Sequence, residues 1–413
     1  MTAPPVAAAP PFRADAAVIG LVGLAHAVSH FSQLLLAPLF PWLKVAFGVG
    51  YAELGLLLSI FFAVSCAVQA MSGFVVDRFG PRPILFAGLG ILALATFGFA
   101  ASQSYAMLAA CSVLAGIGNG VFHPVDYTLL NRKVSAARLG HGYSVHGITG
   151  SLGWALAPAV VVPLAVAYSW RVALAGAGTL ALLVLLVLWI NRERLTLASV
   201  APGKAPLQAT AAEGSFVFLT IPAVWMCFGF FFFYAVSLSG VQAFAPEAAR
   251  LLHGVPAHWL GLCLTIYMVC SAAGMVAGGF LAANPARSER VVGVGFGVAA
   301  TVALVIGFAD IAALAVPVLF GVMGFGAGIA GPSRDLLVKR SAPDNATGRV
   351  YGVVYSGLDI GQAIAPLMFG MLMDRHRPSA VWFGIALVQA VLVVSAFNLR
   401  RARRVGLQPV AAA

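Results

Sequence analysis

The chain has 413 residues, of which 61% are apolar and only 9% are charged. Soluble domains carry about a quarter charged residues, so this composition excludes an ordinary water-soluble enzyme. The net charge of +11 does not indicate nucleic-acid binding, because the basic residues lie in short segments between apolar runs. All five cysteines lie inside apolar runs without paired spacing, so the sequence indicates no zinc site, disulfide framework or cofactor.

Taken in chain order, the apolar runs each have roughly the length of a membrane-spanning helix, about 20 residues. Their approximate bounds are 17–43, 52–76, 84–101, 106–130, 142–166, 171–190, 217–245, 258–282, 291–308, 311–333, 351–373 and 379–398. We therefore predict an all-α membrane protein with twelve transmembrane helices in two pseudo-symmetric six-helix bundles. The predicted parts are a disordered tail (1–15), a first bundle (16–190), a polar linker (191–216), a second bundle (217–399) and a basic tail (400–413).

The basic residues predict the orientation. If the N-terminus is cytoplasmic, 19 of the 24 Lys and Arg residues fall in cytoplasmic segments. Because short cytoplasmic loops carry an excess of Lys and Arg, both termini and the linker are expected in the cytoplasm. The expected location is the cell inner membrane, and the lipid bilayer is the expected environment of a monomer.

The two halves share an internal repeat, which independently supports the division into two bundles. Leu54-Gly55 recurs as Leu260-Gly261 at an offset of 206 residues. Further matches at an offset of 208 include Gly116, Gly118, Gly120 and Pro158, which recur as Gly324, Gly326, Gly328 and Pro366.

The loop between the second and third runs carries the most specific motif. Residues 73–82 read GFVVDRFGPR, which resembles the GxxxDRxGRR loop signature of the major facilitator superfamily, with Pro81 where an Arg is common. Residues 116–124 (GIGNGVFHP) are similar to the fourth span of the fosmidomycin-resistance-type efflux subgroup. The resemblance implies two parallel six-helix halves, transport by alternating access and export of a drug-like compound. It also implies a gating role for Gly73, Asp77, Arg78, Gly80 and Arg82.

Polar side chains inside membrane spans are costly, so each is expected to face a cavity or a partner. In the first half, two groups have the four-then-three spacing of one helix face. They are His26-His30-Gln33 on the first span and Asn119-His123-Asp126 on the fourth. We expect His30, Gln33 and Asn119 to bind substrate. We expect His26, His123, Asp126 and His146 to couple protons, since imidazole titrates near neutral pH. The alternative is that they are structural hydrogen-bonding groups between helices.

The second half has fewer such residues. Tyr234, Gln242 and Gln362 are the candidate substrate-binding residues, and Asp359 is a candidate for proton coupling. Arg334, at the end of the tenth span, is expected to serve as a cytoplasmic gate or to form a local ion pair.

The sequence thus predicts a secondary active transporter of a small molecule that works by alternating access and is driven by a proton gradient. Efflux of a small organic compound by proton antiport competes with proton-coupled uptake of an organic anion or other metabolite. A transporter-like membrane sensor is the alternative from a different class. No catalytic constellation, metal site or nucleic-acid partner is expected, so the chain is not expected to be an enzyme.

Overall fold

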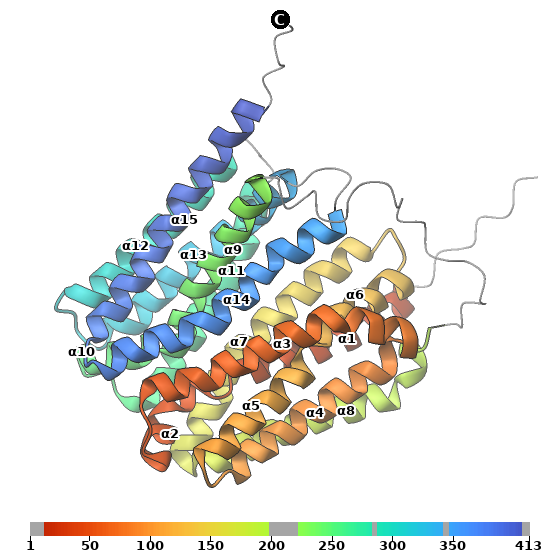
Figure 1. Ribbon diagram of the computed structural model, residues 1–413, viewed down its shortest axis with the longest axis horizontal. Helices are drawn as coiled ribbons and strands as arrows, with labels where there is room; N and C mark the ends of the chain where they lie inside the picture. The colour runs from red at the N-terminus through yellow and green to blue at the C-terminus, as the bar shows by residue number, and fades with distance from the viewer. Residues whose placement is uncertain (1–11, 198–221, 283–286, 342–346, 407–413) are drawn as a thin grey trace, which may run out of the picture.

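The chain folds entirely into helices over the part that the structure describes. A computed structural model describes residues 12–197, 222–282, 287–341 and 347–406, and every regular element in these ranges is a helix (Figure 1). In the first half these are α1 (Phe12–Gln33), η1 (Ala37–Leu39), α2 (Phe40–Phe47), α3 (Tyr51–Phe79), α4 (Pro81–Ala101), α5 (Tyr105–Asn119), α6 (Phe122–Lys133), α7 (Leu139–Ala167), α8 (Trp170–Ile190) and η2 (Arg192–Leu195). In the second half they are α9 (Pro222–Ala243), α10 (Ala245–His253), η4 (Ala257–Trp259), α11 (Leu260–Ala282), α12 (Ser288–Phe308), α13 (Ala315–Ser341), α14 (Thr347–Asp374) and α15 (Pro378–Gly406).

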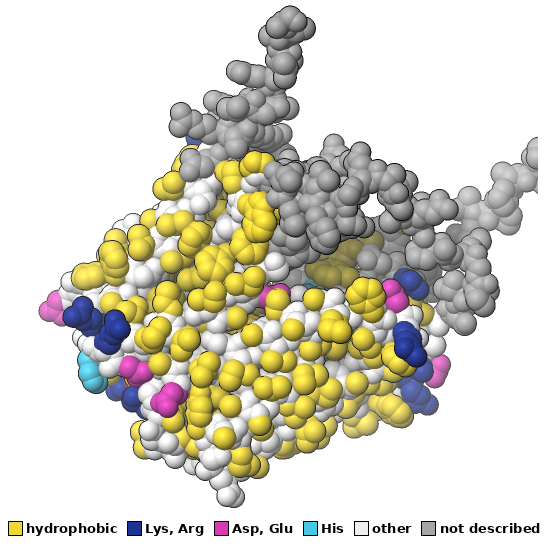
Figure 2. Space-filling model, in the orientation of Figure 1, with side chains coloured by type: hydrophobic (Ala, Val, Ile, Leu, Met, Phe, Trp, Pro, Cys, Tyr) yellow, Lys and Arg dark blue, Asp and Glu magenta, His cyan; other side chains and the backbone are white. Residues whose placement is uncertain are grey.

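These helices confirm the predicted fold class. Among the described residues, twelve segments are long and apolar enough to span a membrane. Figure 2 shows hydrophobic side chains over most of the visible flank, while Lys, Arg, Asp and Glu side chains gather toward its two ends. This distribution suits a bundle surrounded by lipid and flanked by water on both sides.

Two of the expected spans are interrupted, although the sequence predicted continuous helices. The first run is divided between α1 and α2 around η1, where Pro38 and Pro41 each lack a backbone N–H. The fourth is divided between α5 and α6 at Gly120 and Val121. The seventh ends at Ala243, close to its predicted bound, and the short helix α10 follows it. Such breaks are tolerated in a membrane protein where the backbone is buried within the bundle.

The predicted domain boundaries are only partly described. Helix α1 begins at Phe12, inside the predicted tail 1–15, and α15 runs to Gly406, inside the predicted basic tail. The linker predicted over 191–216 begins with the 3-10 helix η2, and its residues from 198 onward lie outside the described ranges.

The repeated glycines and prolines contact each other across the two halves. Helix α3 packs against α14, and α7 packs against α11. A Cβ atom on Gly55 of α3 would lie 2.2 Å from the carbonyl oxygen of Pro366, and one on Gly261 of α11 would lie 2.8 Å from that of Pro158. Gly55 and Gly261 are repeat equivalents, as are Pro158 and Pro366, so the same backbone contact forms twice.

The halves are also joined at the end of the molecule where α3 begins and α14 ends, which we call the far end. The opposite end, where α1 begins and α15 ends, is called the linker end (Figure 1). The carboxylate of Asp374, at the end of α14, accepts hydrogen bonds from the backbone N–H groups of Tyr51 (2.7 Å) and Ala52 (2.8 Å) at the start of α3. A carboxylate at a helix N-terminus is stabilised by the free N–H groups and the helix dipole. Asp374 therefore caps a helix of the opposite half.

A second contact joins the halves at the same end. The buried carboxylate of Glu247 on α10 accepts a hydrogen bond from the Tyr51 hydroxyl (2.7 Å) and forms an ion pair with Arg250 (2.7 Å). The hydrogen bonds to Glu247 raise the pKa of Arg250 above its usual range. The two halves are thus joined at the far end by side chains of α3, α10 and α14.

Candidate functional site

Four histidines and one carboxylate gather inside the first half, and we call them the histidine cluster: His26, His30, His123, His146 and Asp126. Asp126 is fully buried, and its Oδ2 atom lies 3.0 Å from Nδ1 of His26 and 3.1 Å from Nε2 of His146. Residues of α1, α6 and α7 therefore meet at one carboxylate oxygen.

The imidazole rings of this cluster are in contact with one another. The His26 and His146 rings are stacked, with centroids 3.5 Å apart. The His30 ring lies between His26, at 4.4 Å, and the indole of Trp154, at 4.3 Å. His123 lies 5.3 Å from His26 with its ring steeply inclined. The cluster is a continuous group of rings across three helices.

Asn119 forms a second polar node beside the cluster. Its side-chain oxygen accepts hydrogen bonds from Ser29 (2.7 Å) and Gln33 (3.3 Å), and its amide group donates to Ser65 (2.8 Å). Gln33 in turn accepts a hydrogen bond from the Trp154 indole (3.0 Å). Four helices are thus tied together at the break between α5 and α6, next to the imidazoles.

A hydrogen-bonded chain leads from the cluster to the opposite half. Nδ1 of His123 lies 2.8 Å from Oε1 of Gln69 on α3, and Nε2 of Gln69 donates to the carboxylate of Asp359 on α14 (3.2 Å). Gln69 and Asp359 are half-buried. This chain links an imidazole of the first half to a carboxylate of the second.

Exposed tyrosines lie on the linker-end side of the cluster. The Tyr127 ring lies 5.2 Å from His146 and 5.6 Å from Tyr143, and the two tyrosines are 43% and 39% exposed. The buried imidazoles therefore adjoin residues that reach solvent on this side.

The second half places a cation where the first half has Asp126. Arg334 follows Asp126 by 208 residues, the same offset as the nearby repeat. Its guanidinium lies over the ring of Tyr234, 4.2 Å from the centroid, and also near Phe231, at 5.1 Å. Arg334 therefore lies at the end of the tenth span, as predicted, and contacts Tyr234, which was predicted from the sequence to bind substrate.

The structure brings some predicted site residues together and separates others. The stripes on the first and fourth spans meet, through His26 with Asp126 and Gln33 with Asn119, even though the fourth span is broken between Asn119 and His123. Gln242 instead lines a small cavity at the far end beside Glu247, and Gln362 is buried on α14.

Sequence reasoning missed several polar partners of these residues. Gln69 is a polar residue inside an apolar run, the same signal that singled out Gln33, and could have been found from it. Ser29, Ser65 and Trp154 carry no comparable signal, because such residues are common in membrane helices.

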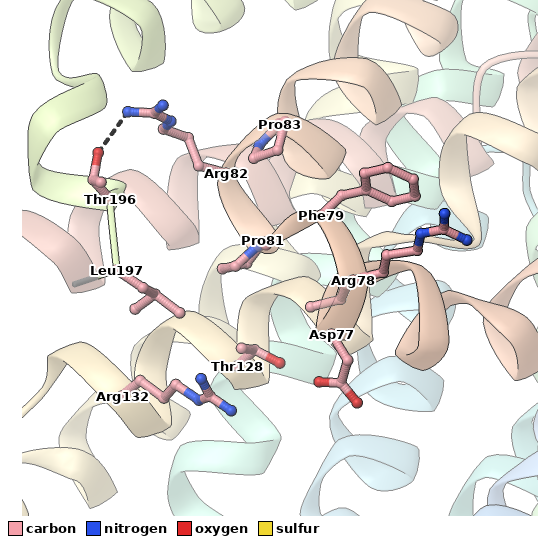
Figure 3. A pocket seen from close by; sticks show the side chains of 12 residues that line it. Asp77, Arg78, Phe79, Pro81, Arg82, Pro83, Thr128, Arg132, Thr196 and Leu197 are labelled. Carbon is pink, nitrogen blue, oxygen red and sulfur yellow. Dashed lines mark hydrogen bonds between the residues drawn. The ribbon is translucent and has the colours of Figure 1, made fainter. Parts of the chain in front are cut away.

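The loop motif surrounds a separate cavity at the linker end. It has a volume of about 500 Å³ and is lined by residues that include Asp77, Arg82, Arg132 and Thr196. Arg82 donates a hydrogen bond to Thr196 (2.5 Å), and Figure 3 shows its side chain turned toward Thr196 and away from Asp77. Within the described residues Asp77 forms no ion pair.

The remaining motif residues shape this loop. Gly80 has a φ of +82°, which favours glycine, and Arg78 lies over the Phe79 ring at 5.3 Å. A Cβ atom on Gly73 would meet open space. The gating role of these residues stays a prediction.

Twelve spans in two repeated bundles, with polar side chains gathered inside and across them, define a membrane transporter. The family profile described as Major Facilitator Superfamily matches residues 22–366 and 237–411. The chain belongs to this superfamily. A bacterial homologue of the human lysosomal transporter Spinster, solved in an inward-facing, unoccupied conformation, has a TM-score of 0.73 at 16% identity and covers 95% of this chain and 96% of its own.

The curated relatives match over a smaller region. A protein named "Probable sulfoacetate transporter" from Cupriavidus necator is 25% identical over 165 residues, 40% of this chain and 38% of its own length. The fosmidomycin resistance protein of Escherichia coli is 25% identical over 164 residues, 38% of each chain. A membrane sensor protein of Salmonella typhimurium is 30% identical over 179 residues, 42% of this chain and 39% of its own. The matches thus span about two fifths of these relatives.

Proposed function

We propose that this protein is a secondary active transporter that exports a small organic compound by alternating access, in exchange for protons. The observation that carries the proposal is the hydrogen bond from Gln69 to Asp359 (3.2 Å), which joins the histidine cluster to the opposite half. Transport requires that the site inside one half responds to the arrangement of the other half.

Asp359 is the proposed coupling residue. A carboxylate that accepts a hydrogen bond across the interface holds the two halves together differently when it is ionised and when it is protonated. Substrate that contacts His123 or Gln69 competes for the same hydrogen-bonding groups. Proton binding and substrate binding are thereby linked through one side chain, which is the requirement for exchange. The roles predicted for His26, His123, Asp126 and His146 in proton coupling stay predictions.

The similarity to the fosmidomycin resistance protein supports efflux. The proposed orientation places the linker end, with both termini, in the cytoplasm of a cell whose inner membrane holds the protein. This orientation is supported by the 19 basic residues of the segments assigned to that side. Because the halves are joined at the far end, we expect the binding site to open toward the cytoplasm in the described conformation.

A second candidate is proton-coupled uptake of an organic anion. It is favoured by Arg334, whose cation lies on the Tyr234 ring inside the second half. A guanidinium is suited to carboxylate and sulfonate groups because it offers a planar set of donors. The similarity to the "Probable sulfoacetate transporter" agrees with this reading. The sensor alternative, favoured by the similarity to a membrane sensor protein, predicts binding without transport.

Transport by the purified protein in proteoliposomes tests these candidates. Full-length protein is reconstituted, and the movement of labelled fosmidomycin and sulfoacetate is followed with and without an imposed pH gradient. Export predicts fosmidomycin movement opposite to the proton gradient, and uptake predicts sulfoacetate movement along it. In either case Asp359→Asn should remove the acceleration by the gradient while substrate binding persists.

Asp310→Asn is the matched control, because Asp310 is an exposed carboxylate between α12 and α13. Gradient-driven transport at the wild-type rate in Asp359→Asn would refute the coupling role. Stabilisation of the protein by either compound without any transport would favour the sensor.

A further inference from the structure

Three imidazoles of the histidine cluster converge in the way that metal ligands do. His26 and His30 lie on α1, and His123 lies on α6. Each offers one ring nitrogen, and the three nitrogen atoms lie within 4.8 Å of one another. Imidazole rings whose nitrogens lie this close either pack against one another without an ion or coordinate one metal ion together. Three further observations distinguish these two cases.

The first observation is the orientation of two of the rings. Nδ1 of His26 is hydrogen-bonded to the carboxylate of Asp126, and when that carboxylate is ionised it only accepts, so this nitrogen then carries the proton. Nδ1 of His123 faces the amide oxygen of Gln69, whose orientation is set because its amide nitrogen donates to Asp359. Both histidines therefore present Nε2 with a free lone pair. Metal-binding histidines are held in this way, with the other ring nitrogen bound to a carboxylate or a carbonyl oxygen.

The second observation is where the third ring points. A Cβ atom on Gly150 of α7 would lie 2.9 Å from Nδ1 of His30 and 3.0 Å from Nε2 of His26. These two nitrogens therefore approach the same point, beside a residue with no side chain. The free lone pair of His26 is directed toward the region where His30 also presents a ring nitrogen.

The third observation is the spacing of the rings. A metal ion about 2.1 Å from each nitrogen lies roughly 3.2 Å from each ring centroid, which puts tetrahedrally arranged centroids about 5 Å apart. The centroids of His26, His30 and His123 are separated by 4.4, 5.3 and 6.3 Å, with the ring planes inclined by 49° to 75°. His26 and His146, stacked at 3.5 Å, are too close and too nearly parallel to direct lone pairs at one ion. The geometry thus selects His123 as the third ligand and leaves His146 to support Asp126.

We propose that His26, His30 and His123 bind one divalent transition-metal ion, with a further coordination position open to water or to a donor atom of a transported compound. Imidazole suits borderline ions such as Zn²⁺, Ni²⁺ and Co²⁺, whereas Mg²⁺ and Ca²⁺ require oxygen ligands. The two positive charges are balanced by Asp126 behind His26 and by Asp359 behind Gln69. The inference goes beyond the proposed function, since it concerns binding and stands whatever compound is transported.

Zinc binding to the purified full-length protein tests the site. Titration calorimetry in detergent with Zn²⁺ should show one ion per chain, while Mg²⁺ at the same concentrations should show none. His30→Ala removes a ligand without touching the hydrogen bonds of Asp126, and should weaken Zn²⁺ binding at least tenfold. His258→Ala is the control, because His258 is an exposed histidine outside the cluster and should leave binding unchanged.

X-ray absorption of the zinc-loaded wild-type protein gives an answer that does not depend on any variant. Three imidazole ligands at about 2.0 Å are expected. Wild-type affinity in His30→Ala, or a spectrum without imidazole scattering, would overturn the proposal. Failure of transport in proteoliposomes would count against the proposed function alone, because zinc binding is measured without a membrane gradient.

Discussion

The two bundles carry opposite charges at positions related by the repeat. Asp126 in the first half is buried and accepts from His26 and His146, while Arg334, 208 residues later, lies on the ring of Tyr234. The backbone contacts of the repeat are kept, since Gly55 meets Pro366 and Gly261 meets Pro158. The scaffold is therefore duplicated while its interior has diverged.

This divergence divides the chemistry of the interior between the halves. A carboxylate among imidazoles favours cations, whether protons or metal ions, and a guanidinium favours anions. A transported compound that contacts both halves would therefore meet two different environments. The pseudo-symmetry of the fold does not extend to what each half can bind.

The largest effect is expected when the carboxylate of the first half is neutralised. Asp126→Asn removes the charge that holds His26 and His146, and hydrogen bonds to charged groups contribute about 1.5–3 kcal/mol each. We expect a lower melting temperature and Zn²⁺ binding weakened by about 10- to 100-fold, as for other residues that support metal ligands. Thermal unfolding and calorimetry on the purified protein measure both. Asp310→Asn serves as the control, and an Asp126→Asn protein equal to wild type in both measurements would remove Asp126 from the site.

Substitution of Arg334, the repeat counterpart of Asp126, should weaken the binding of anions and leave the binding of Zn²⁺ unchanged. Arg334→Gln should weaken sulfoacetate binding about tenfold, because one charge-assisted contact is worth about 1.4 kcal/mol or more. Arg334→Lys should restore little of it, since an ammonium group does not stack on Tyr234 as a guanidinium does. Ligand-induced thermal stabilisation measures the affinity. If Arg334→Gln lowered Zn²⁺ affinity as strongly as anion affinity, the proposed division between the halves would be wrong.

Adding a methyl group at the two repeated backbone contacts should disrupt the far end, and the disruption should be greater where the added Cβ atom lies closer to the carbonyl oxygen. Gly55→Ala places a Cβ atom 2.2 Å from a carbonyl oxygen, and Gly261→Ala places one at 2.8 Å, so both should open the far end and Gly55→Ala should do so more. A cysteine at Ala37, which lines the small far-end cavity, should then react several-fold faster with an impermeant maleimide. Gly20→Ala is the control, because a Cβ atom there would contact nothing within 4 Å. Equal labelling in all three variants would show that these contacts do not hold the far end closed.

The smallest effect is expected at the loop motif, which keeps its charges in the first half only. Residue 77 is Asp, whereas its repeat counterpart is Ala283, which lies outside the described residues. Asp77→Asn should reduce the transport rate a few-fold and leave substrate affinity unchanged, because the residue lines the linker-end cavity and is not part of the histidine cluster. Initial rates in proteoliposomes and binding in detergent separate these quantities. A change in affinity with an unchanged rate would contradict a gating role.

Periodicity and composition predicted much of this structure because they reflect the membrane directly. Twelve apolar runs became twelve spans, and the stripes containing His26 and Asp126 meet, as the resemblance to the superfamily fold implied. The break at Gly120 was not predictable, because glycine is common in membrane helices and Gly116, which packs equally closely against α3, remains helical. The link from Gln69 to Asp359 depends on how two distant helices dock, which spacing along one helix does not encode.

The contact between Asp374 and the start of α3 has a consequence for how the far end changes over evolution. Its two donors are main-chain N–H groups, which every residue except proline supplies. Substitutions other than proline at positions 51 and 52 therefore leave this capping contact in place, whereas loss of the carboxylate at position 374 removes it. This one contribution to holding the far end together therefore depends on the side chain of a single residue of α14.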